Sequence, residues 1–360
     1  METEIKVAEH EIEEEGKGLG TFEKFLFVWV AICIGIGILL SQTVPGIGEA
    51  IDSLSIGQIS IPIGICLFLM MYPAMLNLQT SELKKLGKDP KPVILTLISN
   101  WGVAPFVGAG LAAVFLQGNE QLIVAVILLA ASPCTAMVLI WGYLAEGNQE
   151  QNFITTSINT ITIIFGYVGL VGLLIGLVGL ITGTPITIDW IYLLISAGIF
   201  IGLPLVMGII SKKVIVQRKG EDWFEKVYRP FVGKVAIVAL LTTLIVLFSL
   251  NGKVLIERPD LLLLVSIPLL LGFVIVVSYN LFTTKLLKLK YKEAIITVII
   301  GSSSHFEIAI ATATVLYGVG SIGALGTTMG LFWEVPIMLG LVYLGKYLRR
   351  KNFWKTNNSP

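Results

Sequence analysis

Long apolar stretches separated by short polar loops run along almost the whole chain. About 20 mostly apolar residues are needed to cross the hydrocarbon core of a bilayer, and ten stretches meet this requirement. They lie near 23–44, 57–76, 92–116, 121–143, 153–179, 187–210, 231–250, 261–284, 292–317 and 322–346. Several contain Gly or Pro, which membrane helices tolerate better than soluble helices do. The pattern predicts an all-α integral membrane protein with ten transmembrane helices.

Composition supports the bilayer as the solvent of this protein. Of its 360 residues, 55% are hydrophobic and 14% are charged, and the mean hydropathy is +0.86. A soluble domain carries roughly 25% charged residues. The net charge of +1 gives no indication of a nucleic-acid partner. The lipid bilayer is therefore the expected environment.

The distribution of Lys and Arg predicts the orientation. Both residue types are frequent in the loops after the second, sixth, eighth and tenth stretches and are absent from 45–56, 117–120, 180–186 and 318–321. Only the loop between the seventh and eighth stretches, with Lys253 and Arg258, departs from this alternation. Cytoplasmic loops of membrane proteins carry the excess of Lys and Arg. We therefore expect both ends in the cytoplasm, as an acidic tail over 1–22 and a C-terminal tail over 347–360.

The ten stretches divide into two sets of five, 23–180 and 187–346. An odd number of spans per half places the second half upside down relative to the first, as in many secondary transporters. The fourth and ninth spans, which correspond in this arrangement, are both interrupted by polar residues near mid-membrane. The fourth contains Ser132-Pro-Cys-Thr135 and the ninth contains Gly301-Ser-Ser-Ser-His-Phe-Glu307. Paired interruptions in two inverted five-helix repeats indicate a substrate site where they meet.

Glu307 is the first candidate functional residue. A carboxylate at mid-membrane costs about 2.5–3.5 kcal/mol on insertion scales. Such a residue is retained where it faces a cavity, has a partner or takes up a proton. We expect Glu307 to bind substrate or a proton; the alternative is a protonated side chain that only bonds a neighbouring helix.

Cys134 is the second candidate. Pro133 disrupts the helical turn before it, which leaves Cys134 and Thr135 near the start of a half-helix. A helix N-terminus favours the reactive thiolate, and sulfur is a ligand for soft, thiophilic centres. Cys134 is therefore a candidate metalloid ligand, although small core filler is the usual role of a lone cysteine. Cys33 and Cys66 lack such a setting and are expected in the core.

Polar residues around these two complete the candidate site. Ser303, Ser304 and His305 precede Glu307 and can line a polar cavity or relay protons, or else bond within the helix. Glu334, just before Val335-Pro336 in the tenth span, is either a second proton site or a structural partner, and the structural role is slightly favoured. Asn159 in the fifth span is a weaker candidate.

No enzyme motif accompanies these residues. The sequence lacks GxSxG, a Walker A loop, HExxH and a GxGxxG placed between strand and helix. We expect a transporter without a cofactor. A separate ATPase subunit remains open but is not required.

Several motifs resemble those of the Acr-type arsenite efflux permeases, in the bile acid/arsenite/riboflavin transporter superfamily. Ser132-Pro-Cys-Thr-Ala-Met-Val-Leu-Ile-Trp141 resembles the fourth-span motif of these proteins, and Ser303-Ser-His-Phe-Glu-Ile-Ala-Ile-Ala311 their ninth-span motif. Tyr317-Gly-Val-Gly-Ser321, Glu334-Val-Pro-Ile-Met-Leu339 and Met71-Tyr-Pro73 fit as well. The likeness runs over nearly the whole membrane portion.

The resemblance implies ten helices in two inverted repeats, with broken helices four and nine crossing at the centre. It implies export of arsenite, and in some members antimonite, across the cell membrane by proton antiport. Cys134 would be the essential thiol, with Ser132 and Thr135 beside it, and Glu307 the proton-coupled acid. No metal other than the metalloid substrate is implied.

Two positions depart from the family pattern. Many members have two Asn residues before the Phe-Glu pair, where this chain has Ser304 and His305. Many also have Asn-Asp in the fifth span, where Thr160 follows Asn159. The strongest alternative is a sodium-coupled organic-anion symporter of the bile acid type, which shares the architecture but does not need Cys134.

Overall fold

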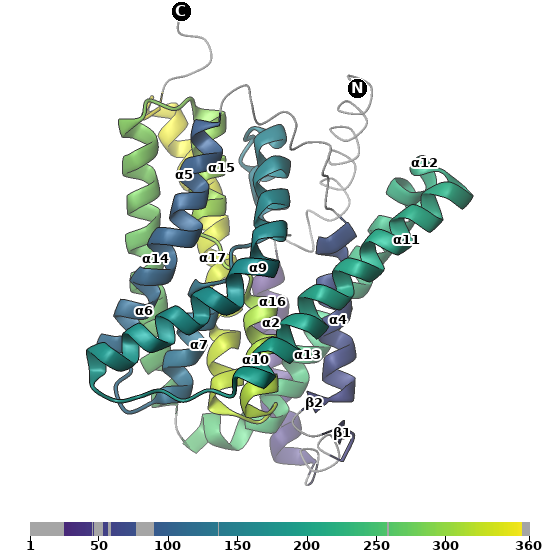
Figure 1. The fold of residues 1–360 in the computed structure, drawn as a ribbon, viewed down its shortest axis with the longest axis vertical. Coiled ribbons are helices and arrows are strands. Elements are labelled where there is room, and N and C mark those ends of the chain that lie inside the picture. The colour runs from purple at the N-terminus through teal and green to yellow at the C-terminus, as the bar shows by residue number, and fades with distance from the viewer. Residues whose placement is uncertain are drawn as a thin grey trace, which may run out of the picture.

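A computed structural model describes residues 25–44, 46, 53–56, 59–76, 90–135, 137–257 and 259–354. Every predicted span coincides with one helix or with consecutive helical segments (Figure 1). The first half of the chain forms α2 (Leu26–Thr43), β1 (Ser55–Ile56), β2 (Ile59–Ser60), α4 (Ile61–Leu76), α5 (Lys91–Ile98), a π-helical turn (Ser99–Val103), α6 (Ala104–Phe115), α7 (Glu120–Ala130), α8 (Met137–Leu144) and α9 (Gln149–Thr182).

The second half is helical almost throughout. It forms α10 (Trp190–Ala197), a π-helical turn (Gly198–Gly202), α11 (Leu203–Lys219), α12 (Glu221–Trp223), a third π-helical turn (Phe224–Tyr228), α13 (Arg229–Glu257), α14 (Asp260–Leu286), α15 (Tyr291–Gly301), α16 (Phe306–Tyr317) and α17 (Ile322–Arg350). The two-residue strands β1 and β2 pair only with each other, antiparallel, before α4.

Six helical segments of the described chain are long and apolar enough to cross a membrane. Shorter apolar helices account for the remaining predicted spans, among them α7 and α16. The prediction of a multi-pass helical membrane protein is confirmed. The total of ten crossings and the division into inverted repeats stay predictions.

The segment expected to be the long loop between the sixth and seventh spans is helical. α11 continues to Lys219, nine residues past the apolar stretch, and helix resumes at Glu221. Between them Gly220 has a φ of +87°, a left-handed conformation that glycine adopts without steric cost. One glycine therefore replaces the expected polar loop. At the other end of the chain, α17 likewise extends to Arg350 and Trp354 is buried.

The helices pack in two groups. α13 lies along α2 and α4, and α11 also packs on α4. In the second group, α14 packs against α6 and α15, while α17 packs against α7 and α16. Contacts of α16 with α4 and α10 join the two groups. The broken spans, α7–α8 and α15–α16, belong to the second group and lie at its centre.

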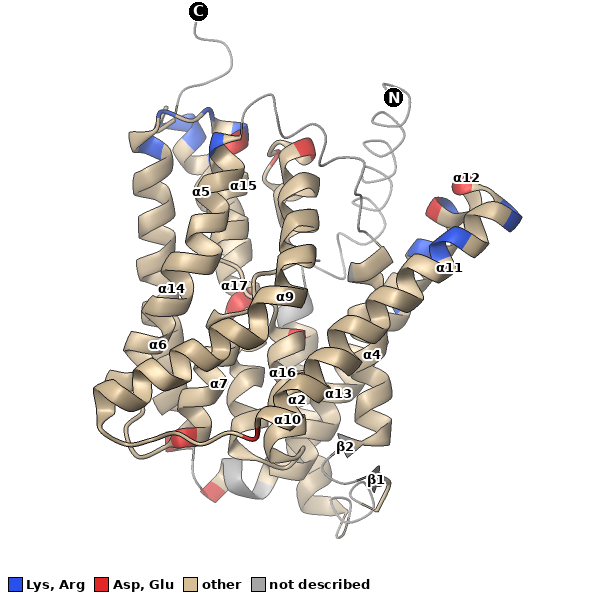
Figure 2. Ribbon diagram, viewed as in Figure 1, with Lys and Arg blue, Asp and Glu red and all other residues tan. Residues whose placement is uncertain are grey.

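Charged side chains gather at the helix ends. Figure 2 shows that Lys and Arg of the described residues lie at one end of the molecule, on α11 and around the ends of α14, α15 and α17. The opposite end shows acidic residues but no basic ones among the side chains that the structure describes. The lysines 84, 85 and 88 and residue 258, which the orientation argument also used, lie outside the described residues, as does the side chain of Lys253 near the end of α13. The asymmetry is the one expected from the positive-inside rule.

Candidate functional site at two broken spans

The breaks predicted in the fourth and ninth spans are present and lie against each other. α7 ends at Ala130 and α8 begins at Met137, while α15 ends at Gly301 and α16 begins at Phe306. Pro133 and Ser304 pair as an isolated antiparallel bridge. Non-helical backbone survives at membrane depth only where its polar groups find partners within the protein. Each break supplies such partners to the other.

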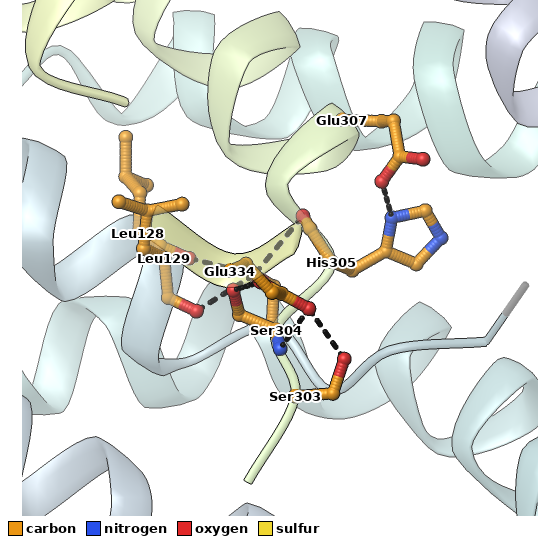
Figure 3. Close-up of polar contacts among 8 residues, drawn as sticks. Leu128, Leu129, Ser303, Ser304, His305, Glu307 and Glu334 are labelled. Atoms are coloured by element: carbon orange, nitrogen blue, oxygen red, sulfur yellow. Dashed lines mark hydrogen bonds and ion pairs between the residues drawn. The ribbon is translucent and has the colours of Figure 1, made fainter. Parts of the chain in front are cut away.

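Ser132 fixes this crossing with its hydroxyl group. Its Oγ lies 2.9 Å from the carbonyl oxygen of Leu128, 3.0 Å from that of Leu129 and 3.2 Å from that of His305 (Figure 3). The first two carbonyls belong to the last turn of α7, where no intrahelical donor is available. Ser132 therefore ends α7 and holds the ninth-span segment against it, a structural use of the hydroxyl.

His305 and Glu307 form a buried pair on the ninth span. His305 Nδ1 lies 2.9 Å from Glu307 Oε2, although the angle falls outside hydrogen-bond geometry. Nε2 of the same ring has no hydrogen-bond partner among the described residues. His305 is 1% exposed and Glu307 is 8% exposed. A role of His305 as a proton relay, one of the alternatives from the sequence, stays a prediction.

Ser303 and Ser304 turn instead toward the tenth span. Both hydroxyl groups donate to the carboxylate of Glu334, with Ser304 Oγ 2.5 Å from Oε2. The Ser304 N–H donates a third hydrogen bond, 3.1 Å, to Oε1. Figure 3 shows Glu334 directed at these serines and Glu307 directed at the His305 ring. The two carboxyl groups therefore have different partners in the same break.

Cys134 and Thr135 lie in the fourth-span break and are buried, at 2% and 1% exposure. The side-chain nitrogen Nδ2 of Asn159, on α9, donates a 3.3 Å hydrogen bond to the Cys134 carbonyl oxygen. Thr135 Oγ1 and Asn159 Oδ1 have no hydrogen-bond partner within the described chain. Asn159, a weak candidate from sequence, thus contacts the motif directly. Cys33 is buried in the core as expected, and Cys66 is partly buried.

Asn280, in the C-terminal third of α14, is a polar contact of the break that the sequence analysis missed. Its Nδ2 lies 3.1 Å from Ser302 Oγ and 2.9 Å from Ser99 Oγ. Ser99 Oγ in turn donates to the Gly301 carbonyl oxygen at 2.8 Å. The sequence did contain a signal for this contact: Asn280 is a polar residue within an apolar span, and such residues at membrane depth usually have polar partners.

The predicted site residues are thus divided among three sets of contacts. Ser132 supports the crossing, Ser303 and Ser304 bind Glu334, and His305 contacts Glu307. Within the described residues, no group of three or more His, Cys, Asp or Glu side chains could hold a metal ion. The arrangement provides a thiol, two buried carboxyl groups and an imidazole around paired main-chain breaks.

Comparison with known proteins identifies relatives along most of the chain. The model of a family described as the Sodium Bile acid symporter family matches residues 64–258. An uncharacterized transporter of Synechocystis sp. is 40% identical over 94% of this chain and 91% of its own length.

Two further relatives are named arsenical-resistance protein Acr3. The one from Alkaliphilus metalliredigens is 36% identical over 93% of this chain and 95% of its own length. The one from Corynebacterium glutamicum is 30% identical over 92% of this chain and 90% of its own length. The chain therefore belongs to the Sodium Bile acid symporter family, as an Acr-type permease.

Proposed function

We propose that this protein exports trivalent arsenic, as arsenite, in exchange for protons. The observation that carries the proposal is the pair of Acr3 arsenical-resistance relatives, each matched over at least nine-tenths of both chains. The presence of a buried cysteine, Cys134, in the break that meets the ninth span is in keeping with a thiophilic substrate. The family and the relatives are transporters, which fits the lack of an enzyme motif.

The chemistry of arsenite suits the groups at the fourth-span break. At neutral pH arsenite is the uncharged trihydroxide As(OH)₃, so it needs hydrogen-bonding groups and a soft ligand rather than a fixed countercharge. Thr135 Oγ1 and Asn159 Oδ1 are buried and have no hydrogen-bond partner among the described residues. Cys134 would supply the soft ligand, because sulfur prefers thiophilic centres. When the thiol binds covalently, one S–H and one As–OH bond break, one S–As bond forms and water leaves.

Glu307 and His305 are proposed to couple export to the proton gradient. Glu307 would bind either a proton or the substrate, so that a proton entering from outside displaces the metalloid outward. The His305 ring, 2.9 Å away, is placed to pass protons to the carboxylate or to stabilise its charge. Mutually exclusive binding at one carboxyl group is sufficient for antiport, and no separate ATPase subunit is required.

Antimonite is proposed as an additional substrate. It is also a neutral, thiophilic trihydroxide, so it would use the same thiol and the same hydrogen-bonding groups. Competition between antimonite and arsenite for transport is the corresponding test.

The protein is proposed to lie in the cell membrane with both termini in the cytoplasm. The support is the gathering of Lys and Arg at one end of the described chain (Figure 2), since cytoplasmic loops carry the positive excess. Export then runs from the basic end toward the acidic end.

A sodium-coupled organic-anion symporter is the second candidate function. The description of the matching family, which names sodium and bile acid, favours it. Such a site would use main-chain carbonyls and polar side chains at the same crossing and would not need Cys134. Sodium dependence together with insensitivity to loss of Cys134 would identify this function.

The test is arsenite uptake into everted membrane vesicles, with and without an imposed proton gradient, in sodium-free buffer. We expect accumulation that is abolished by a protonophore and survives without sodium. Accumulation only after sodium is added, or only of organic anions, would replace the proposal with the symporter function. Vesicles without the protein provide the background.

A further inference from the structure

We propose that Glu334 is a second proton-binding site of this permease, served by a hydrated cavity on the side of the crossing away from His305. The inference rests on the proposed proton-coupled export and adds a carboxyl group with a role of its own. The sequence alone slightly favours a structural role for Glu334, and the inference differs from that expectation.

A cavity lies beside the hydroxyl groups that bind Glu334. It has a volume of about 70 Å³ and is bounded by α6, α7, α14 and α17 and by the ninth-span break. Its wall is mostly apolar. Its polar residues are Ser132 of the fourth-span break, Asn100 of the π-helical turn before α6, and three of the ninth-span break: Ser302, Ser303 and Ser304. A water molecule occupies about 30 Å³ in the liquid and needs two to four polar partners. The cavity is therefore large enough to hold water at its polar end.

Asn100 adds a polar side chain to the wall of the cavity. This residue belongs to the π-helical turn before α6 and is only 3% exposed. Its Nδ2 has no hydrogen-bond partner in the described part of the chain. Leaving a buried amide donor unpaired costs about 1–3 kcal/mol, so this side of the cavity is polar at a cost in stability.

The contacts of Glu334 respond to protonation. As a carboxylate it accepts from two serine hydroxyls and from the Ser304 N–H. When it takes a proton from water, the new O–H becomes a donor, and one serine hydroxyl must rotate to accept it. That hydroxyl can then donate into the cavity. Protonation therefore changes the hydrogen bonds that hold the residues preceding His305.

Few other ionisable groups lie near the middle of α17. Glu307, at the start of α16, is the other acidic residue beside the ninth-span break, and His305 contacts it. The remaining acidic and basic side chains described on helices packed against α17 lie toward the helix ends: Glu120, Arg229, Lys234, Glu257, Asp260, Lys285, Lys292 and Glu293. Glu307 and Glu334 are therefore the two acidic side chains described near the middle of these spans.

The first test needs no substrate. A protonated carboxyl group has a carbonyl infrared band that the carboxylate lacks, so pH-difference spectra of the purified full-length protein report its titration directly. We expect acidification to produce a band that is diminished in Glu334→Gln and retained in Glu120→Gln, a matched change at the exposed start of α7. A Glu334→Gln spectrum identical to that of the unmodified protein overturns the inference, whatever the substrate is.

The second test separates coupling from binding. In everted vesicles, Glu334→Gln is expected to lose more gradient-driven arsenite accumulation than exchange of labelled for unlabelled arsenite, with a difference of roughly fivefold or more, the size of a typical coupling between two ligands. Filling the cavity by Gly272→Leu is expected to lower gradient-driven accumulation in the same way. A Cβ at Gly272 meets only Leu111 Cδ1, at 3.7 Å.

Unchanged gradient-driven accumulation in Glu334→Gln overturns the inference. So does equal loss of exchange and accumulation in a correctly folded variant, which is the result of a purely structural role. Failure of the unmodified protein to move arsenite would instead contradict the proposed function and leave the infrared test decisive for Glu334.

Discussion

The His305 N–H donates a 2.7 Å hydrogen bond to the carbonyl oxygen of Ser132, joining residues 173 positions apart. This bond and the Pro133–Ser304 bridge fix the two broken spans in one register. Any movement of one break is therefore transmitted to the other. The candidate thiol and both candidate carboxyl groups belong to elements attached to this crossing, and the predictions below follow from that arrangement.

Replacing Glu307 by Gln should abolish gradient-driven arsenite export, because an amide of nearly the same shape cannot bind and release a proton. The measurement is arsenite accumulation in everted vesicles under an imposed proton gradient. Glu120→Gln is the matched control and should behave as the unmodified protein. Vigorous proton-driven export by Glu307→Gln would remove Glu307 from the coupling mechanism.

Replacing Cys134 by Ala should reduce arsenite transport much more than replacing Cys33 by Ala. Both side chains are buried, so the loss of packing is comparable and the difference reports the soft ligand. Initial rates of arsenite uptake, normalised to the amount of protein in the membrane, provide the comparison. Equal effects of the two substitutions would reduce Cys134 to packing.

Replacing Ser132 by Ala should lower the stability of the protein by about 1–3 kcal/mol, because the buried carbonyl groups beside it lose a hydroxyl donor. The midpoint of thermal unfolding in detergent measures this loss. Ser249→Ala is the control, since among the described residues Ser249 Oγ bonds the Val246 carbonyl of its own helix. If both variants unfold at the same temperature, Ser132 does not hold the crossing.

Glu146 links the turn between α8 and α9 to the end of α17. Its carboxylate lies 3.1 Å from Lys346 Nζ and 2.7 Å from Arg349 Nη1. The hydrogen bond from Lys346, followed by Arg349, holds the pKa of Glu146 below its ordinary value of 4.5. Because the folded state lowers this pKa, the stabilisation is present above the ordinary value and is lost as the pH falls through the folded pKa.

We therefore expect Glu146→Gln to lower the unfolding midpoint at neutral pH and low salt. The side chain is 56% exposed, so solvent screening limits the effect to about 1 kcal/mol or less. The difference between the two proteins should shrink in high salt and disappear on acidification below the folded pKa. A difference that persists unchanged in acid would point to packing rather than charge.

Replacing Gly108 by Ala should destabilise the contact between α6 and α7 by about 1–3 kcal/mol. A Cβ at Gly108 would lie 2.4 Å from Ala130 Cβ, whereas one at Gly110, on the same helix, meets nothing within 4 Å. Gly110→Ala is therefore the matched control and should be neutral or slightly stabilising. Unfolding midpoints of the two variants that coincide would argue against close packing of these helices.

The sequence predicts the helices and both breaks because each depends on local features. A run of apolar residues is long enough to span or it is not, and Pro133 or three consecutive serines interrupt such a run visibly. The partners of the break residues are set by tertiary packing instead. Nothing in the sequence distinguishes a Ser303 hydroxyl that bonds its own helix from one that bonds Glu334, 31 residues away.

Two further differences between the sequence prediction and the structure, at Asn280 and after the sixth span, also have physical reasons. Asn280 lies in an otherwise apolar span, and only the placement of α14 beside the π-helical turn brings it to Ser302. The polar segment after the sixth span was expected to be a loop because of its charges. Helix propensity of Lys, Arg and Gln together with a single turn at Gly220 makes it helical.

The mutual pairing of the two breaks has an evolutionary consequence. Restoring continuous helix in one span would leave the main-chain polar groups of the other without partners in a medium that offers none, at several kcal/mol per group. Neither interruption can be lost alone by a viable single step. The fourth-span and ninth-span interruptions should therefore be inherited together, whichever polar residues form the ninth, so that lineages with one interruption and not the other are expected to be absent.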